Sequence, residues 1–413
     1  MRQCKYSVKV MRRYADMGWS VAKQAGMIYF PKHKERNVAM MKRLRYAMVG
    51  GSKGSFIGPV HRMAIRMDNL ADLVAGAFSR DPKKNAETAG ELGLSAEHVH
   101  PDWTSLLATE KDNIDFLAVC TPNDSHYEIA KAALEAGLDV MCEKPLSMTV
   151  AEAEELGRLA RRKRRILGIP FSYSGMPMVK FARELVAQGE IGKVCKIVLE
   201  YNQGSFRKID LTKPLDVRNA WKMDPRRSGP SCAVADIGVH AFHMLEYVTG
   251  LEVKEVLADL SSFAPGNRLE DDASILLRFK GGAKALLNVS KVATGEENGL
   301  RLRVYGEKAS LHWNQEENDY LVLKSPFEPH RTYSRKAPYM KTASASFART
   351  SRIPAGHHEG FMEAFANIYD EFCAAVKTRE PRDFPGAHEG VRTMRFVEAV
   401  LASHKAGGVW TKV

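Results

Sequence analysis

The chain has 413 residues and a mass of 46.0 kDa, which exceeds the usual size of one domain, so we predict two. Its 45% hydrophobic and 27% charged residues are ordinary for a globular protein, and no stretch approaches about 18 consecutive apolar residues, which excludes a transmembrane helix. The net charge is +12, but residues 1–44 hold eleven Lys or Arg against two acids, so +9 lies there and +3 in the remainder. The body of the protein is nearly neutral, which argues against nucleic acid as its partner.

Residues 1–40 form a basic extension ahead of the first expected strand. They are poor in acids, as a targeting or nucleic-acid-binding arm would be, yet they lack the continuous apolar core of a secretory signal. We favour the alternative that the natural start is Met40 or Met41 and that the upstream residues are dispensable.

The six cysteines are scattered along the chain, with no C-x-x-C pair. This spacing fits neither a disulfide framework nor a zinc site. We therefore expect a cytoplasmic protein in a reducing environment.

Residues 41–170 alternate short apolar runs with amphipathic stretches, a pattern that predicts βαβ units and a parallel sheet. The expected strands are Tyr46–Val49, Leu73–Phe78, Phe116–Cys120, Val140–Cys142 and Ile166–Ile169. The expected helices are about Ile57–Met67, Pro82–Leu92, Ser125–Ala136 and Thr149–Arg164. Right-handed crossovers between such strands give a doubly wound, Rossmann-type α/β domain.

A glycine-rich loop follows the first expected strand and opens the first helix. Its candidate cofactor-binding residues are Gly50, Gly51, Ser52, Phe56, Ile57 and Gly58. Glycines let the backbone approach a pyrophosphate, and the helix N-terminus supplies free N–H donors and the positive end of a dipole. The spacing departs from G-x-G-x-x-G, because Ser52 stands where a second glycine is usual. We take Gly50 as the turn glycine and Gly58 as the glycine that packs the helix on the strand.

The end of the second expected strand bears on the choice between NAD and NADP. An acid there would hold an NAD ribose, whereas a basic residue would tolerate a 2′-phosphate. Ser79 stands where the acid is usual and Arg80 follows it, which favours NADP slightly. Asp81 could still reach the ribose, so NAD stays open.

Two further segments follow strands at the carboxyl edge, where ligands bind in such sheets. The first contains Thr121, Pro122, Asn123 and His126, and the second contains Glu143, Lys144 and Pro145. Because Pro145 disfavours helix for the residue before it, Lys144 should lie extended at the mouth of its strand. A lone Lys before Pro is more often a surface turn, but a buried Lys beside a nicotinamide can donate to a substrate oxygen, and the context favours that role.

Residues 171–385 predict an α+β domain with a large, mostly antiparallel open sheet. The expected strands are Lys193–Gln203, Val253–Ser262, Ala273–Phe279, Ala283–Val289 and Leu300–Tyr305. Residues 325–356 are polar and without clear period, which predicts a long loop. Helices are expected at about Glu359–Val376 and His388–His404, and residues 386–413 form the C-terminal helix and tail.

Asp236 and His240 open an apolar helix in this second domain. At i and i+4 they share one helical face, so the carboxylate could orient the imidazole, which could then remove a hydroxyl proton as hydride leaves the same carbon. A capping Asp and a solvated His are the bland alternative. A metal site that adds His243 needs an unlikely rotamer, so we expect no metal.

Together these segments, with His61 after the glycine-rich loop, resemble the glucose-fructose oxidoreductase / inositol dehydrogenase / MocA-like (Gfo/Idh/MocA) family over nearly everything from residue 41 onward. The resemblance implies a Rossmann domain, a second domain whose open sheet faces a partner subunit in a dimer or tetramer, and oxidation or reduction of sugars or inositols. It implies that Lys144 bonds the reacting oxygen, that His240 accepts the proton and that Asp236 is its partner. Glu143, Asn123 and His126 would lie around the nicotinamide ribose.

Three residues are weaker candidates for contact with a sugar-like substrate: Tyr173 at the domain junction, Trp221 and His357. Trp221 could stack on a sugar face or only anchor its loop. We expect an NAD(P)-dependent dehydrogenase acting on a CH–OH group of a sugar, cyclitol or glycoside. The alternatives are a dehydrogenase of a non-sugar carbonyl and a non-catalytic NAD(P) sensor, although a sensor could afford to lose the Lys, Asp and His.

Overall fold

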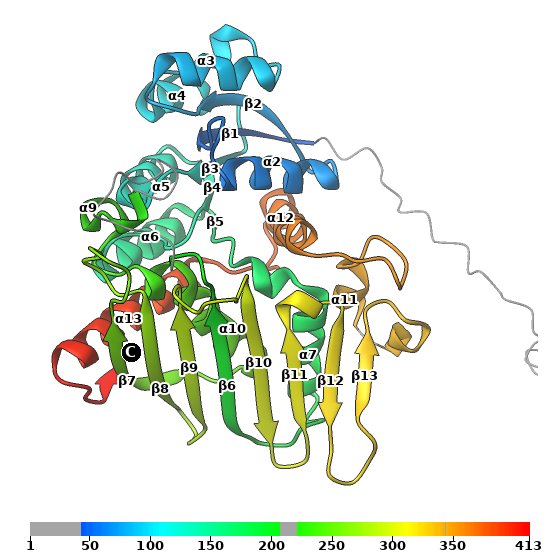
Figure 1. Cartoon of the computed structure of the whole chain (residues 1–413). Helices are drawn as coiled ribbons and strands as arrows, with labels where there is room; N and C mark the ends of the chain where they lie inside the picture. Colours follow the sequence, from blue (N-terminus) through cyan, green and yellow to red (C-terminus); the bar gives the residue numbers. More distant parts are fainter. Residues whose placement is uncertain (1–42, 207–220, 343) are drawn as a thin grey trace, which may run out of the picture. The chain divides into compact units, whose positions relative to one another are not determined.

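The computed structural model describes residues 43–206, 221–342 and 344–413 (Figure 1). The basic extension predicted for residues 1–40 lies outside the described residues. The described part contains two sheets, one parallel and one mostly antiparallel. This is the α/β architecture that the sequence predicted.

The first sheet has five parallel strands in the order β2-β1-β3-β4-β5. Its strands are β1 (Leu44–Gly50), β2 (Ala71–Ala77), β3 (Phe116–Cys120), β4 (Asp139–Cys142) and β5 (Leu167–Gly168). Its helices are α2 (Ile57–Met67), α3 (Pro82–Glu91), α4 (Trp103–Glu110), α5 (His126–Glu135) and α6 (Val150–Lys163). Every predicted strand and helix of this sheet is confirmed to within a few residues, and α4 is an addition.

Helix α6 shows why the predicted boundaries held. The Thr149 side chain accepts from the Glu152 N–H, and the Glu152 carboxylate accepts from the Thr149 N–H in return. This reciprocal pair satisfies two backbone donors that a helix N-terminus otherwise leaves free. At α3, Pro82 occupies the first turn, where its missing N–H costs nothing.

The second sheet has nine strands in the order β13-β12-β11-β10-β6-β9-β8-β7-β14. They are β6 (Val194–Asn202), β7 (Val253–Ser261), β8 (Asp272–Phe279), β9 (Lys284–Ser290), β10 (Gly299–Gly306), β11 (Ser310–Asn314), β12 (Tyr320–Lys324), β13 (Arg331–Ser334) and β14 (Thr411–Lys412). Only the central pair β6 and β9 is parallel. Helices α7 (Pro177–Ala187), α10 (Val239–Thr249) and α13 (Ala387–Lys405) lie along one face (Figure 1). Buried residues alternate with exposed or half-buried ones along β8, as expected when one face is covered.

The prediction of a long loop without secondary structure at residues 325–356 is wrong. The segment holds β13, a short helical turn at Pro338–Thr342 and α11 (Ala345–Arg349). These elements are too short to show a period in sequence. The nearly fully buried Arg335 anchors the segment, because its Nε lies 2.6 Å from Oδ1 of Asp319.

Helix α12 (Phe361–Thr378) packs against the first sheet, although the division at residue 171 assigned it to the second domain. Its Tyr369 and Phe372 share a core with Met48 and Phe116 of that sheet. The ring centroids of Phe116 and Phe372 lie 5.3 Å apart. The parallel sheet therefore draws part of its core from residues about 250 positions later in the chain.

No helix in the described ranges is both long and apolar enough to cross a bilayer. The five cysteines in those ranges are all free thiols, and four of them are buried.

Candidate active site

The loop between β1 and α2 has the close backbone contacts that only glycine permits. Gly50 and Gly51 have φ angles of 81° and 72°, in the left-handed region. A β-carbon at Gly50 would lie 2.6 Å from the carbonyl oxygen of Cys120, and one at Gly58 would lie 2.2 Å from the Cα of Gly51. Side chains at these positions would thus break the packing of α2 on β1 and β3.

The first turn of α2 is open to an anion. The helix begins at Ile57, its N-cap residue Phe56 makes no side-chain cap hydrogen bond, and the first turn holds no acid. Ser52, which replaces the second glycine, is buried, and its carbonyl accepts from Ser55 N–H at 2.9 Å. Free N–H groups at the positive end of the helix dipole suit a pyrophosphate, so the loop fits a dinucleotide.

At the end of β2, Asp81 is already engaged. Its Oδ1 accepts from the N–H groups of Lys83 at 3.0 Å and Lys84 at 3.3 Å, which caps α3. The Asp81 N–H in turn donates to Oγ of Ser79 at 3.1 Å. The idea that Asp81 reaches the ribose therefore loses its support. Arg80 is exposed and has no ion pair or hydrogen bond within the described part of the chain.

The side chains of His126 and Asn123 tie loops together. His126 Nδ1 lies 2.8 Å from the Pro145 carbonyl and Nε2 lies 2.8 Å from the Thr121 carbonyl, so the ring joins the segments after β3 and β4. Asn123 donates to the Ser228 carbonyl at 2.9 Å, in the short helix α9 (Pro225–Ser228). Pro122 caps the turn that carries Asn123. The predicted place of these residues around the ribose stays a prediction.

Glu143 is buried and paired with a histidine. His61 Nε2 lies 2.8 Å from its Oε1, and the Lys144 backbone N–H donates to its Oε2 at 3.1 Å. The other ring nitrogen of His61 lies 2.6 Å from the Tyr369 hydroxyl of α12. Burial opposes the imidazolium, yet the nearby Cys120 and Glu143 raise the pKa of His61 above its ordinary value. Burial acts in the opposite direction on Glu143 and would raise its pKa, but the neighbouring His61 holds the pKa of Glu143 below its usual range.

Lys144, which directly follows Glu143 at the end of β4, forms an ion pair with Asp236, which lies in the turn before α10. Lys144 Nζ donates to Asp236 Oδ1 and to the Asp236 carbonyl, each at 2.8 Å. Oδ2 of Asp236 accepts from Lys291 at 2.6 Å and from Lys222 at 3.1 Å. Burial alone would raise the pKa of the Asp236 carboxyl, but the three ammonium groups hold it well below its ordinary value.

Within the described residues no hydrogen bond joins Asp236 to His240, although the charge of Asp236 acts to raise the pKa of the imidazole, so the predicted support of His240 by Asp236 stays a prediction. Residues Val234–Gly238 form a π-helical turn, and α10 begins only at Val239. Asp236 is instead bound by lysines, and Nδ1 of His240 has no hydrogen-bond partner within the described ranges.

His240 lies in an aromatic enclosure. Its ring meets Phe171 and Tyr173 edge-on, with centroid distances of 5.7 and 5.3 Å. Burial, reinforced by the positive charge of Lys144, lowers the pKa of His240 well below 6.5. The imidazole is therefore neutral at physiological pH and able to accept a proton.

The weaker substrate candidates have different surroundings. Tyr173 is buried, and its hydroxyl lies 2.5 Å from that of Tyr201 and accepts from Asn298 at 3.1 Å. Trp221 is half-buried and opens the turn that carries Lys222. His357 is exposed, and its carbonyl accepts a hydrogen bond from Arg335. The predicted contact of His357 with the substrate stays a prediction.

Sequence reasoning missed Lys222 and Lys291. Lys291 follows the apolar strand β9, and Lys222 follows Trp221. Neither position has a motif, and only the fold brings them to Asp236.

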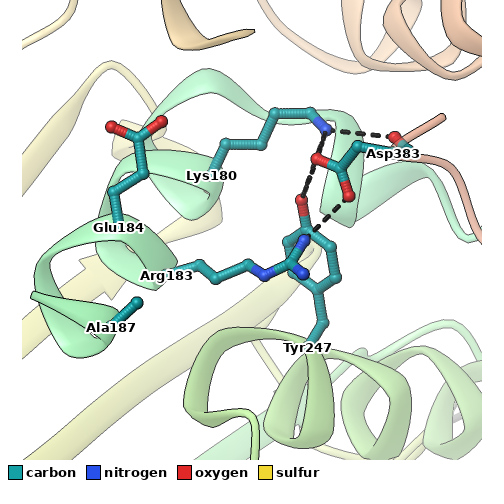
Figure 2. Close-up of a pocket in the computed structure, with 6 residues that line it drawn as sticks. All are labelled: Lys180, Arg183, Glu184, Ala187, Tyr247 and Asp383. Atoms are coloured by element: carbon teal, nitrogen blue, oxygen red, sulfur yellow. Dashed lines mark hydrogen bonds and ion pairs between the residues drawn. The ribbon is translucent and has the colours of Figure 1, made fainter. Parts of the chain in front are cut away.

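A pocket elsewhere is not part of this site. Figure 2 shows it, lined by Lys180, Arg183, Glu184, Ala187, Tyr247 and Asp383. Lys180 binds Asp383 at 2.5 Å and Arg183 binds it at 2.8 Å. None of the candidate site residues lines this pocket.

In the described ranges no group of three or more His, Cys, Asp or Glu is arranged to hold a metal.

Comparison with known proteins places both halves of the chain. Residues 44–171 match the oxidoreductase family with an NAD-binding Rossmann fold, and residues 179–312 match the GFO/IDH/MocA C-terminal domain. The uncharacterized oxidoreductase YfiI of Bacillus subtilis is 36% identical over 90% of this chain and 97% of its own length. Levoglucosan dehydrogenase of Pseudarthrobacter phenanthrenivorans is 27% identical over 68% of this chain and 76% of its own. The crystal structure of an inositol dehydrogenase homolog from Azotobacter vinelandii, complexed with NADH and myo-inositol, has a TM-score of 0.84 and 33% identity and covers 90% of this chain and 98% of its own.

Proposed function

Because the chain belongs to the Gfo/Idh/MocA family of NAD-binding oxidoreductases, we propose that it transfers a hydride between NAD(P) and a secondary alcohol or ketone of a sugar, cyclitol or glycoside. Relatives named for levoglucosan and inositol support this substrate class. The observation that best supports this proposal is the ion pair between Lys144, which follows β4, and Asp236, which lies in the turn before α10. Beside this pair is the buried His240, whose Nδ1 has no hydrogen-bond partner in the described ranges.

The roles of the residues follow from their donors and acceptors. Bound NAD(P) supplies the carbon that takes or returns the hydride. Lys144 spends two of its three N–H bonds on Asp236, and the third is left to donate to the reacting oxygen. His240 accepts the hydroxyl proton as the carbon loses its hydride, and returns it in the reduction. Asp236 holds Lys144 in place.

A substrate screen tests the proposal. Neutral sugars, cyclitols and glycosides are offered with each dinucleotide, and the nicotinamide absorbance is followed. We expect turnover of at least one polyol that carries a free secondary hydroxyl. Tight dinucleotide binding with no turnover of any member would instead favour a sensor.

For the cofactor we propose that NADP is accepted at least as well as NAD. Ser79 leaves no carboxylate to repel a 2′-phosphate, Asp81 is occupied as a helix cap, and Arg80 is exposed without a partner in the described ranges. The NADH in the Azotobacter relative keeps NAD as the competing choice.

We expect Arg80→Ala to weaken NADP binding about tenfold or more, because a charge-assisted hydrogen bond contributes about 1.5–3 kcal/mol. NAD binding should change little. Titration of the protein with each reduced dinucleotide, followed by nicotinamide fluorescence, measures both affinities. Equal weakening of the two would show that Arg80 does not bind the 2′-phosphate.

We propose that the open face of the second sheet joins subunits into a dimer or tetramer in the cytoplasm. Leu276 of β8 and Leu286 of β9 are directly paired and 44% and 40% exposed, an apolar pair on a face that no helix covers in Figure 1.

We expect the wild type to be oligomeric and the double substitution Leu276→Lys with Leu286→Lys to yield monomers, because burying two lysines in an interface is costly. Light scattering after size exclusion measures the mass. The matched control is Phe327→Lys, at an 85% exposed position after β12, which should leave the mass unchanged. A monomeric wild type would contradict the proposal.

A further inference from the structure

Lys291 is a nearly fully buried lysine, with 3% of its side chain exposed. It directly follows β9, and its N–H donates to the Asp271 carbonyl at 2.7 Å. Its ammonium lies 4.9 Å from the centre of the Phe206 ring. Backbone and side chain are thus both held, so the ammonium occupies a fixed place in the site.

The one ion-pair partner of Lys291 in the described part of the chain is Asp236. The ammonium lies 2.6 Å from Oδ2, the shortest of the three lysine contacts with that carboxylate. Oδ1 is left to accept from Lys144. A carboxylate gripped at one oxygen by a rigid donor cannot rotate freely, so its other oxygen keeps one direction.

The direction of Oδ1 matters because Lys144 is flexible. A lysine ammonium is a point charge on a stem of four methylene groups, and the stem alone does not fix where the charge lies. Here the ammonium is fixed by the two hydrogen bonds that it donates to Asp236. A displacement of about 1 Å at a reacting group can lower a rate about a hundredfold.

Lys222 is less able to grip the carboxylate. Its ammonium lies 3.1 Å from the same oxygen, and 31% of its side chain is exposed. It stands on a single helical turn, Trp221–Met223, rather than at the end of a central strand.

We infer that Lys291 is a positioning residue for hydride transfer: by holding Oδ2 of Asp236 it aims Oδ1, and through it the Lys144 ammonium, at the reacting oxygen. The inference rests on the proposed function for its effect on turnover. We assign Lys291 no contact with substrate or dinucleotide, and its action passes entirely through Asp236.

Steady-state kinetics of Lys291→Met tests the inference, with Lys291→Arg as the conservative variant. The matched control is Lys180→Met, which removes an equally buried lysine from Asp383 and leaves that aspartate Arg183, as Lys291→Met leaves Asp236 two other lysines (Figure 2). We expect Lys291→Met to lower kcat about 10- to 100-fold with unchanged dinucleotide affinity, the usual size of such indirect effects. Lys291→Arg should recover most of the loss, and Lys180→Met should lose little. Retained kcat in Lys291→Met, or equal losses in Lys291→Met and Lys180→Met, would overturn the inference.

Titration of the Asp236 carboxyl by ¹³C NMR, assigned with Asp236→Asn, gives a readout that needs no turnover. Removing one ammonium should raise the pKa of Asp236 in Lys291→Met and leave it unchanged in Lys180→Met. A wild type without activity on any polyol would reject the proposed function, and the titration would still test the contact between Lys291 and Asp236 on which the inference depends. An unchanged Asp236 titration in Lys291→Met would overturn it.

Discussion

Lys144→Ala will lower kcat/KM for the polyol by about 10²- to 10⁴-fold, the usual contribution of a positioned group that handles charge at the reacting atoms. The loss has two physical parts. The proposed donor to the reacting oxygen is lost, and the half-buried Asp236 loses the lysine that donates to both its Oδ1 and its carbonyl. Dinucleotide affinity should change little, because we expect the phosphate contacts to come from the glycine-rich loop and the first turn of α2, which lie outside the substitution. Initial rates at saturating dinucleotide and varied polyol measure kcat/KM, and fluorescence titration measures the affinity for the dinucleotide.

The control for Lys144→Ala is Lys180→Ala, which removes a buried lysine from the Asp383 pocket instead. Both proteins should bind the dinucleotide, and only Lys144→Ala should lose turnover. Near-normal turnover in Lys144→Ala would reject the proposed role of the lysine.

The second large effect is expected at His240. His240→Ala should reduce oxidation by about 10²- to 10⁴-fold, because no neutral imidazole remains to take the hydroxyl proton. Reduction should suffer equally, since the same group must return the proton. Initial rates in both directions with purified protein measure the effect.

The pH profile of the wild type carries the same information. Burial, with Lys144 beside it, places the pKa of His240 well below 6.5, so the imidazole stays neutral as the pH falls through 6.5. It becomes protonated, and the oxidation rate falls, only at a lower pH. We therefore expect the acid limb of kcat/KM to lie below the ordinary histidine value. An acid limb at 6.5 or above would contradict the assignment.

His243→Ala is the matched control for His240→Ala. His243 lies on the same helix, is equally buried and has a pKa lowered to about 4, chiefly by burial. Its ring stacks on Phe171 at 4.6 Å. Its loss should cost stability but far less turnover than the loss of His240.

Local signals in the sequence predicted most of the first sheet and its phosphate loop. Thr149 and Glu152 show their capping relation at a spacing of three residues, and Gly50 and Gly58 bracket a strand-to-helix turn. Each of these features depends on neighbours within a few positions. For that reason the predicted bounds of α2 match the observed Ile57–Met67.

The candidate site could be predicted only in part. Lys144, Asp236 and His240 were identified from motifs, but the ion pair between Lys144 and Asp236 was not, because it joins residues 92 positions apart that only the fold brings together. Lys291 carries no local signal, since its meaning comes from an aspartate 55 positions earlier. Its partner becomes visible only once the end of β9 is placed beside the Val234–Gly238 turn that carries Asp236.

The packing of α12 on the first sheet separates the order of synthesis from the order of assembly. The ribosome finishes the five parallel strands long before it reaches Tyr369, yet that residue holds His61, and His61 holds the carboxylate next to Lys144. A nascent chain therefore carries the dinucleotide-binding half with an unfilled core until its last quarter emerges. The contacts that hold Glu143 beside Lys144 can therefore form only after α12, near the C-terminus, has been synthesised.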